Sequence, residues 1–380
     1  MKKSAHKNKD ILLVTEYFAP HWTGISQSCY YIAKSLIEQG YNVHVLTTQY
    51  GLELPLHEVR DGIEIERVPY QIRLSRTHYS WKIVLRFISS IRNFDCVIIN
   101  SPNSNILFLA ILAKIFGKRL IIYHQGDLVM PKQTGNFLVH KIVEMFFDAL
   151  TIPAMFLADR ISTFTEDYAQ NSRVMKYFLY KFFPYIPALV ISQNKPDTVF
   201  KAKLDTLKSK HILIGFAGRF VEEKGFDVLL EAIPLVSKKY PQSLFVFAGK
   251  TDIDYEPFFE KLKPMIEKNK NYLNFMGLLN ENNLAYFYKN LHCFVLSSRS
   301  ECLALTQLEA LLQKVPVVVS NIPGARMPVK ETGYGVVVEP ESPQSLSDGI
   351  IKILNSKETL LKKYPNVDLF FKRYAVFHID

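Results

Sequence analysis

The chain has 380 residues, 48% hydrophobic and 13% aromatic, so it is long enough for two domains and apolar enough to fill two cores. Lys and Arg outnumber Asp and Glu by 46 to 36, and the net charge of +10 favours an anionic partner such as a nucleotide, a nucleic acid or a membrane surface. No apolar run reaches the roughly 18 residues of a membrane span, and no apolar stretch of signal-peptide length follows the basic start, so we expect neither feature.

The first half of the chain alternates short apolar runs with helical patterns, which is typical of a parallel sheet with crossover helices. A loop with Pro20 and Gly24 follows the first run, and Gly40 closes the first helix. Strands are predicted at 11–18, 42–48, 96–100 and 119–124, and helices at 26–40 and 105–117.

The second half repeats this alternation from residue 211 onwards. Its strands are predicted at 211–220, 243–249, 272–277, 291–298, 315–320 and 333–340. Its helices are predicted at 225–239, 255–268, 281–290 and 303–313, and a last helix is opened by Ser342 and Pro343.

The two halves therefore predict two doubly wound, Rossmann-like α/β domains in tandem. We place the N-terminal domain at 1–192 and the C-terminal domain at 193–360, with the polar stretch 192–210 as their connection. Such folds bind ligands at the carboxyl ends of their strands, so we expect the active site in a cleft between the domains.

The four cysteines, Cys29, Cys96, Cys293 and Cys302, are far apart and form no CxxC or Cys/His cluster. This spacing supports neither a disulfide framework nor a structural zinc site. A reducing, cytoplasmic setting fits this usage, and we expect no bound metal.

A loop with two cations follows the first strand of the second half. Gly218 permits tight backbone geometry, and Arg219 and Lys224 bracket a turn that leads through Gly225 into a helix. Two cations at a helix N-terminus suit a diphosphate. The alternative is a surface turn in which the neighbouring glutamates pair with Lys224.

Two glutamates with seven residues between them, Glu301 and Glu309, flank the start of the helix predicted at 303–313. The amides at this helix start would face the same phosphates. Glu301 is suited to a hydroxyl of an attached sugar and Glu309 to the paired hydroxyls of a ribose. Solvation of both glutamates is the alternative, but Glu309 lies within a strongly apolar segment.

These motifs together resemble a known family. GRFVEEKG, the glutamate pair in ECLALTQLEALLQKVPVVVS, and NIPGARMPVKETGYGVVVEP are similar to the C-terminal domain of glycosyltransferase family 4, and EYFAPHWTGISQSCYYIAKSLIEQGYNVHVLTT is similar to its N-terminal domain. The resemblance spans nearly the whole chain. It implies the GT-B fold and a retaining, metal-independent transferase that uses a nucleotide-sugar donor. It also implies that the segment 361–380 returns to the first domain.

The resemblance also implies roles for single residues. Arg219 and Lys224 would hold the donor diphosphate, Glu301 would face the transferred sugar, and Glu309 would face the ribose. His124, at the end of a strand, would lie near the sugar, although a structural histidine is the alternative. Further donor contacts are implied for Gly24, Gly218, Cys302, Leu303, Ala304 and Leu305, and acceptor-side positions for Gly126 and Asp127.

The sequence departs from the family pattern at three places. Cys302, Leu303 and Ala304 stand where Gly-Phe-Gly commonly follows the first glutamate. The first-domain loop has one glycine where two are common, and Arg326 stands in place of a common glutamate.

Residues 173–191 combine Arg173, Lys176 and Lys181 with six aromatic residues and no acid. The stretch 175–183 is predicted as an interfacial amphipathic helix or, alternatively, as a core helix followed by a strand. With the net charge, the first interpretation places the enzyme peripherally on the inner face of the cell membrane, where it meets a lipid-linked acceptor.

The sequence thus predicts a cytoplasmic hexosyltransferase that moves a sugar from a UDP- or GDP-linked donor to a glycan or lipid-linked acceptor, without a cofactor and without nucleic acid. A non-catalytic nucleotide-sugar-binding or membrane-surface protein on the same fold is the alternative from another class. An epimerase or phosphorylase would need further acid and base groups in the cleft. A dinucleotide oxidoreductase is disfavoured because neither half carries GxGxxG after its first strand.

Overall fold

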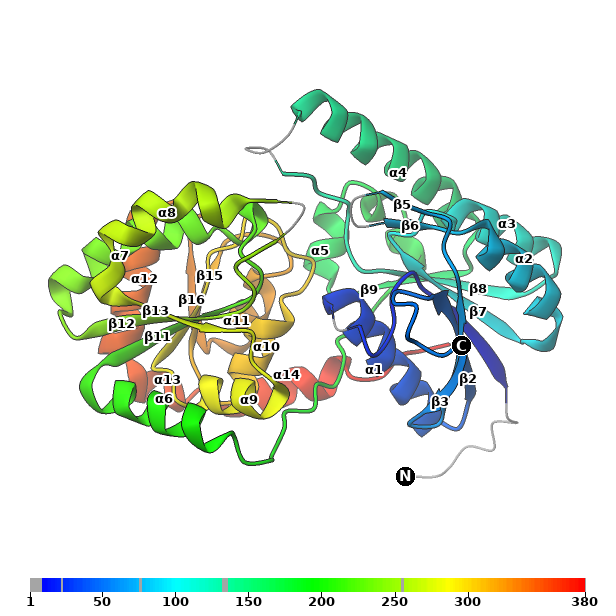
Figure 1. Cartoon of the computed structure of the whole chain (residues 1–380). Coiled ribbons are helices and arrows are strands. Elements are labelled where there is room, and N and C mark those ends of the chain that lie inside the picture. Colours follow the sequence, from blue (N-terminus) through cyan, green and yellow to red (C-terminus); the bar gives the residue numbers. More distant parts are fainter. Residues whose placement is uncertain (1–8, 22, 75–76, 132–135, 254–255, 380) are drawn as a thin grey trace. The chain divides into compact units, whose positions relative to one another are not determined.

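The computed structural model describes residues 9–21, 23–74, 77–131, 136–253 and 256–379 (Figure 1). The chain divides into two compact units. Unit 1 comprises residues 1–130, 138–188 and 374–380, and unit 2 comprises residues 131–137 and 189–373. The basic start, residues 1–8, lies outside the described residues, as does position 255 of a predicted helix.

Unit 1 is built on an eight-stranded sheet with the order β10-β9-β8-β7-β1-β2-β4-β3, in which β3 alone is antiparallel to its neighbour among the described strands. The next two strands, β5 and β6, form a separate antiparallel pair. The bounds are β1 Asp10–Val14, β2 Asn42–Thr48, β3 His57–Arg60, β4 Ile63–Val68, β5 Ile72–Leu74, β6 Thr77–Tyr79, β7 Cys96–Ser101, β8 Arg119–His124, β9 Arg160–Thr163 and β10 Phe182–Pro184.

The helices of unit 1 cover both faces of this sheet (Figure 1). Thr23 caps the first of them by accepting from the Ser26 amide, and the Ser26 hydroxyl accepts from the Thr23 amide in return. The bounds are α1 Gly24–Glu38, α2 Trp81–Ser90, α3 Ile106–Ile115, α4 Phe137–Leu157 and α5 Glu166–Asn171. A core of aliphatic side chains from β1, β7 and β8 packs against α2, α3 and α4.

Unit 2 is a six-stranded parallel sheet with the order β13-β12-β11-β14-β15-β16. Its first strand lies in the centre, and the chain winds outward from it in both directions, which is the doubly wound topology. The bounds are β11 Ile212–Ala217, β12 Ser243–Ala248, β13 Leu273–Gly277, β14 Cys293–Leu296, β15 Val317–Ser320 and β16 Gly335–Val338. The predicted fold class is confirmed for both units.

The helices of unit 2 alternate with its strands (Figure 1). Their bounds are α6 Thr198–Lys210, α7 Phe226–Lys239, α8 Phe258–Lys268, α9 Glu281–Lys289, α10 Leu305–Leu312, α11 Arg326–Thr332, α12 Pro343–Asn355, α13 Lys357–Leu361 and α14 Pro365–Tyr374. After α14 the chain enters unit 1, where the Ile186 amide donates to the Tyr374 carbonyl at 3.0 Å.

Three local predictions are wrong. Residues 192–210 are not only a polar connection, because α6 forms there and buries Leu204 fully. The first strand ends at Val14 rather than at residue 18, and the following residues turn away. No α-helix forms at 175–181: two 3-10 turns stand there, since Asp127 and the Ser172 hydroxyl accept from amides at the start of this stretch.

Candidate active site

The loop after β11 carries the two predicted cations of unit 2. It leaves the strand at Gly218, whose φ of +148° favours glycine, and enters α7 at Gly225 with a φ of +64°. A Cβ at Gly225 would lie 2.0 Å from the Ser297 carbonyl oxygen. Glycine at this position therefore lets the loop lie directly against the residues that follow β14.

Lys224 and Glu301 meet at this junction although 77 residues separate them in sequence. Lys224 Nζ donates to Glu301 Oε1 at 2.6 Å, and Ser298 Oγ donates to the same oxygen at 2.7 Å. The contact follows from the topology, because β11 and β14 are neighbours at the point where the winding direction reverses. The structure thus brings together a cation and a carboxylate to which the sequence assigned separate roles.

The electrostatics of this pair keep Lys224 charged. Burial lowers the pKa of Lys224, but the negative charges of Glu301 and Glu223 outweigh it, so its pKa stands above the usual value. The Lys224 side chain keeps 20% of its surface exposed and that of Glu301 keeps 7%. Because the ammonium has three donors, it can bind Glu301 and a ligand at the same time.

Arg219 is more open than Lys224. Its guanidinium lies 3.4 Å from Glu223 Oε1, and 46% of its side chain is exposed. The next residue, Phe220, is fully buried and packs edge-on against Phe226 with ring centroids 4.3 Å apart. This aromatic pair anchors the loop between Arg219 and α7, so the two cations have a fixed base.

The residues after Glu301 approach α10 along a buried path. The helix begins at Leu305, two residues later than predicted, and no side chain caps it at Ala304. Leu303, Ala304 and Leu305 are buried, and burial raises the pKa of the Cys302 thiol to about 12. A Cβ at Gly324 would lie 2.3 Å from the Glu301 carbonyl oxygen, so the turn before α11 packs closely on this segment.

Glu309 lies within α10 and is bound by a tyrosine. Tyr288, on α9, donates its hydroxyl to Glu309 Oε2 at 2.7 Å. Burial raises the pKa of Glu309 to about 7 despite this hydrogen bond. The structure does not join Glu309 to Lys224 or Glu301 by any contact among the described residues.

Arg299 is a site residue that the sequence reasoning missed. Its guanidinium forms two parallel hydrogen bonds of 2.8 Å with the Asp227 carboxylate and donates to Glu341 and to the Glu222 carbonyl. The residue therefore ties the loop after β14 to the start of α7. Its position beside Glu301 in the sequence was the available signal, but its partners are distant along the chain.

In unit 1, His124 ends β8 and is held on both sides. Its Nδ1 lies 3.1 Å from Ser101 Oγ and its Nε2 lies 3.1 Å from Asp127 Oδ1, and only 2% of its side chain is exposed. Gly126 adopts a φ of +145°, which lets the chain turn back so that Asp127 meets the ring. These three predicted residues lie together.

Asp127 is saturated with hydrogen bonds. Besides His124, it accepts from the Ser172 hydroxyl at 2.7 Å and from the Arg173 amide at 2.6 Å. Burial raises the pKa of Asp127, but the bonds from His124, Ser172 and Arg173 outweigh it and hold the pKa at about 2. The carboxylate thus fixes the loop after β8 rather than pointing outward.

Gly24 is the first residue of α1 and is exposed, with nothing within 4 Å of an added Cβ. After β1, the structure shows a group of buried side chains that the sequence did not indicate. Glu16 is buried, accepts from the Ser104 amide at 2.8 Å, and has its pKa raised by burial to about 7. His78 stacks on Tyr70 with ring centroids 4.0 Å apart.

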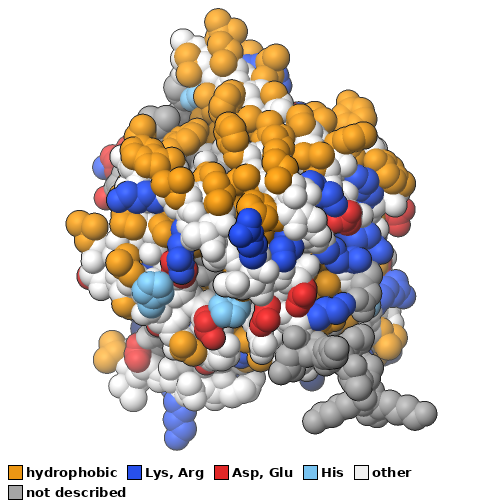
Figure 2. Space-filling view, turned by 90° about the vertical axis from the view of Figure 1, so that its right-hand side faces the viewer, with side chains coloured by type: hydrophobic (Ala, Val, Ile, Leu, Met, Phe, Trp, Pro, Cys, Tyr) orange, Lys and Arg blue, Asp and Glu red, His pale blue; other side chains and the backbone are white. Residues whose placement is uncertain are grey.

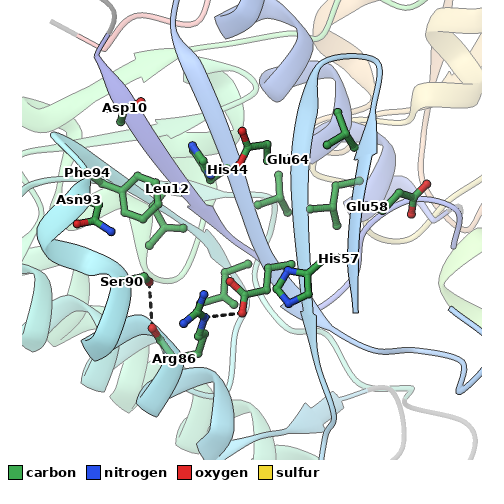
Figure 3. A pocket seen from close by; sticks show the side chains of 15 residues that line it. Asp10, Leu12, His44, His57, Glu58, Glu64, Arg86, Ser90, Asn93 and Phe94 are labelled. Atoms are coloured by element: carbon green, nitrogen blue, oxygen red, sulfur yellow. Dashed lines mark hydrogen bonds and ion pairs between the residues drawn. The ribbon is translucent and has the colours of Figure 1, made fainter. Parts of the chain in front are cut away.

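A surface hollow of about 560 Å³ lies beside β2, β3, β4 and α2 of unit 1 (Figure 3). Two pairs of ionisable side chains lie in its lining: Arg86 with Glu66, and His44 with Glu64 at 2.9 Å. None of the predicted site residues lines it.

In the described part of the chain, no helix is both long and apolar enough to cross a membrane.

Two family models match the chain. The model described as Glycosyltransferase Family 4 matches residues 22–173, and the model described as Glycosyl transferases group 1 matches residues 200–366. The first match lies within the sequence of the N-terminal half and the second covers the loop of Arg219 and Lys224 together with α10.

Curated relatives agree with these matches. An uncharacterized glycosyltransferase of Haemophilus influenzae is 24% identical, covering 91% of this chain and 90% of the relative. The GPI3 subunit of the phosphatidylinositol N-acetylglucosaminyltransferase of Saccharomyces cerevisiae is 22% identical over 69% of this chain, which spans 56% of that relative's length. The capsular polysaccharide biosynthesis glycosyltransferase CapM of Staphylococcus aureus is 26% identical over 41% of this chain and 40% of its own length.

Solved structures share the fold over almost the whole chain. A sucrose-phosphate synthase from Thermosynechococcus elongatus has a TM-score of 0.75 at 15% identity, covering 97% of this chain and 95% of that one. Anabaena HepE, solved in complex with UDP, has a TM-score of 0.74 at 16% identity, covering 98% and 97%. With both units matched by glycosyltransferase models and the fold shared with GT-B enzymes, the chain is a GT-B glycosyltransferase and belongs to glycosyltransferase family 4.

Proposed function

We propose that the chain transfers a hexose from a nucleoside-diphosphate sugar to a glycan or lipid-linked acceptor, with retention at the anomeric carbon and without a bound metal. The observation that carries this proposal is the junction of Lys224 and Glu301, with Arg219 on the same loop. Unit 2 binds the donor in this proposal, and unit 1 binds the acceptor.

The two cations would act on the leaving group. When the bond between the anomeric carbon and the phosphate oxygen breaks, negative charge grows on the diphosphate and positive charge grows on the sugar ring. Lys224 and Arg219 would stabilise the first of these charges, together with the amides at the start of α10, which no side chain caps. These groups supply positive charge that a metal ion would otherwise supply, and this is the basis of the proposed metal independence.

Glu301 would hold the sugar and set the position of Lys224. One of its oxygens accepts from Lys224 and Ser298, and its carboxylate would accept from a sugar hydroxyl as well. Glu309 would accept from the ribose hydroxyls beside Tyr288. Retention requires the acceptor oxygen to reach the anomeric carbon from the face that the phosphate leaves, so the departing phosphate oxygen can take the proton of the acceptor hydroxyl.

The names of similar proteins support the substrate class. HepE has been solved with UDP-glucose, and CapM is named for capsular polysaccharide biosynthesis. A further structural neighbour, WaaG, is described as acting in lipopolysaccharide biosynthesis. We therefore propose a UDP- or GDP-linked donor and a role in surface polysaccharide or glycoconjugate synthesis.

The test is nucleotide release from a panel of UDP-, GDP- and ADP-sugars, with and without lipid acceptors and with EDTA present. We expect release with at least one donor that persists in EDTA, and a product whose anomeric configuration, read by NMR, matches that of the donor. Tight donor binding without nucleotide release in any combination would instead favour the non-catalytic alternative. The buried Leu303 and Ala304, which stand where the family commonly has Phe and Gly, support that alternative.

A further inference from the structure

Three helices of unit 1 expose large apolar side chains on their outer sides. On α2, Trp81, Leu85 and Ile88 follow one another at spacings of four and three residues, and the first two are 60% and 61% exposed. These spacings place the three side chains along one stripe of the helix. The opposite stripe, with Ile83 and Phe87, is buried in the core, so the outer stripe is not needed to hold the helix on the sheet.

The next two helices repeat this arrangement. On α3, Phe108, Ile111 and Ile115 lie at helical spacing and are exposed, while Leu109, Ala110 and Ala113 are buried. On α4 the exposed residues include Ile142, Met145 and Phe146, and the buried ones include Phe147, Ala154 and Met155. Soluble surfaces usually carry such residues singly rather than in three adjoining stripes.

The three stripes belong to one face of unit 1. The connection through α3 joins β7 to β8 and that through α4 joins β8 to β9, so right-handed crossovers place both helices on the same side of the sheet. The helix α2 packs beside α3 (Figure 1). Figure 2 shows hydrophobic side chains gathered over the upper part of this side of the molecule, with Lys and Arg side chains in a band beneath them.

Basic groups border these stripes. The helices α2 and α3 contain Lys82, Arg86 and Lys114 but no Asp or Glu, and Arg86 pairs with Glu66 on β4 and Lys114 with Asp159 after α4. On α4, both acids are bound by cations: Glu144 by Lys141 and Asp148 by Arg173. Beyond these pairs, Lys82 and Lys176 are exposed cations of this face. A second copy of the chain would bring these like charges together across the interface, whereas an anionic lipid surface complements them.

The turn after α5 extends the same pattern. Tyr177 and Tyr180 are 60% and 73% exposed, and Lys181 lies over the rings of Tyr180 and of Phe156 at the end of α4, at 5.6 and 5.5 Å. Exposed tyrosine and tryptophan rings beside lysines are typical of protein surfaces that meet lipid headgroups. The sequence had placed a helix here, but the two 3-10 turns still expose the aromatic and basic groups.

We propose that the outer stripes of α2, α3 and α4, with the turn at 175–181, form a membrane-docking face that binds an anionic lipid bilayer. The helices lie on the bilayer rather than cross it, and the lysines contact the headgroup phosphates. This inference deepens the proposed function by giving its partner, the membrane that carries a lipid-linked acceptor, and it rests on that function only for the acceptor.

Flotation with vesicles tests the docking face. We expect the intact chain to float with phosphatidylcholine vesicles that contain phosphatidylglycerol, to float less with pure phosphatidylcholine, and to be released by salt. Leu85→Ser, Phe108→Ser and Met145→Ser together should lower the bound fraction by about tenfold or more. The control, Val199→Ser with Leu278→Ser, removes two apolar side chains of unit 2 that are even more exposed, at 81% each, and should float like wild type.

The outcomes separate this inference from the proposed function. Binding of nucleoside diphosphates, measured without lipid, should be the same in the triple variant and in wild type, and it also reports that the variant is folded. A wild-type chain that stays unbound at low salt while it binds nucleotide would overturn the docking face alone. Self-association of the wild type that the triple variant abolishes, without flotation of either, would also overturn it, because a second copy would then cover these helices.

Discussion

The two units place ionisable residues at the carboxyl edge of a parallel sheet but hold them in opposite ways. In unit 1, His124 is enclosed between Ser101 and Asp127, and both ring nitrogens have partners. In unit 2, Lys224 forms an ion pair with Glu301 while part of its side chain stays exposed, and the Arg219 side chain is nearly half exposed. The comparison teaches that unit 2 leaves its cations partly open to solvent, whereas the hydrogen-bonded pair of unit 1 fixes a loop.

The largest expected effect comes from Lys224→Ala. Removing a cation that stabilises charge in the transition state costs about 10²–10³-fold in turnover, and the change also leaves Glu301 without its partner. Nucleotide release from the best donor measures the loss. Lys270→Ala is the matched control, because Lys270 is an exposed cation of unit 2 that pairs with Glu267, three residues before it in the chain. Full activity of Lys224→Ala would sink the diphosphate assignment.

A smaller effect is expected from Asp127→Asn, and it appears in stability. The pKa of Asp127 is held at about 2, below its usual 3.8, so the carboxylate stabilises the folded chain above that usual value and the contribution is lost as the pH falls toward 2. The variant should lose about 2 kcal/mol near neutral pH, and the difference from wild type should shrink in acid.

Chemical denaturation at several pH values checks this prediction. An equal loss for Asp127→Asn at all pH values would show that the carboxylate charge does not stabilise the loop after β8. No loss at any pH would remove the contrast between the two units.

The smallest effect is expected from Glu309→Gln. The pKa of Glu309 is raised to about 7 from 4.5, so wild-type stability falls as the pH rises from 4.5 to about 7. Glutamine can still accept from Tyr288 and has no proton to lose. The variant should therefore gain roughly 1 kcal/mol over wild type between about pH 5 and pH 6.

Thermal or chemical unfolding at the two pH values gives this difference. Glu16→Gln is the counterpart in unit 1, because burial also raises the pKa of Glu16 to about 7 and the sign should be the same. A Glu309→Gln gain that does not change with pH would mean that Glu309 is charged throughout.

The sequence predicted the fold well where apolar runs are short and bounded. β2 at Asn42–Thr48 and β8 at Arg119–His124 match the predicted ranges, because turn residues flank each run of alternating or apolar residues. It missed α6, whose pattern is mostly polar with Leu204 as its buried residue, and α4, which is apolar on several sides and so lacks clear periodicity.

The site was harder to derive because its contacts are distant along the chain. Residue types and local spacing indicated Lys224 and Glu301 separately. Their contact becomes apparent only in the fold, where β11 and β14 are adjacent strands. The same holds for Arg299, whose partners Asp227 and Glu341 lie on either side in sequence. For His124 the sequence left a structural role as an alternative. The sequence around the end of one strand does not show that both ring nitrogens have partners, because those partners are brought together only by the fold.

Binding of nucleoside diphosphates by calorimetry most directly tests the claim that the loop after β11 holds the donor diphosphate. With UDP, GDP and ADP as probes, we expect at least one to bind wild type and Lys270→Ala equally. The double variant Arg219→Ala with Lys224→Ala should bind that probe about 100-fold more weakly, since two charge-assisted contacts are lost. Equal affinity of the double variant and wild type would contradict the claim.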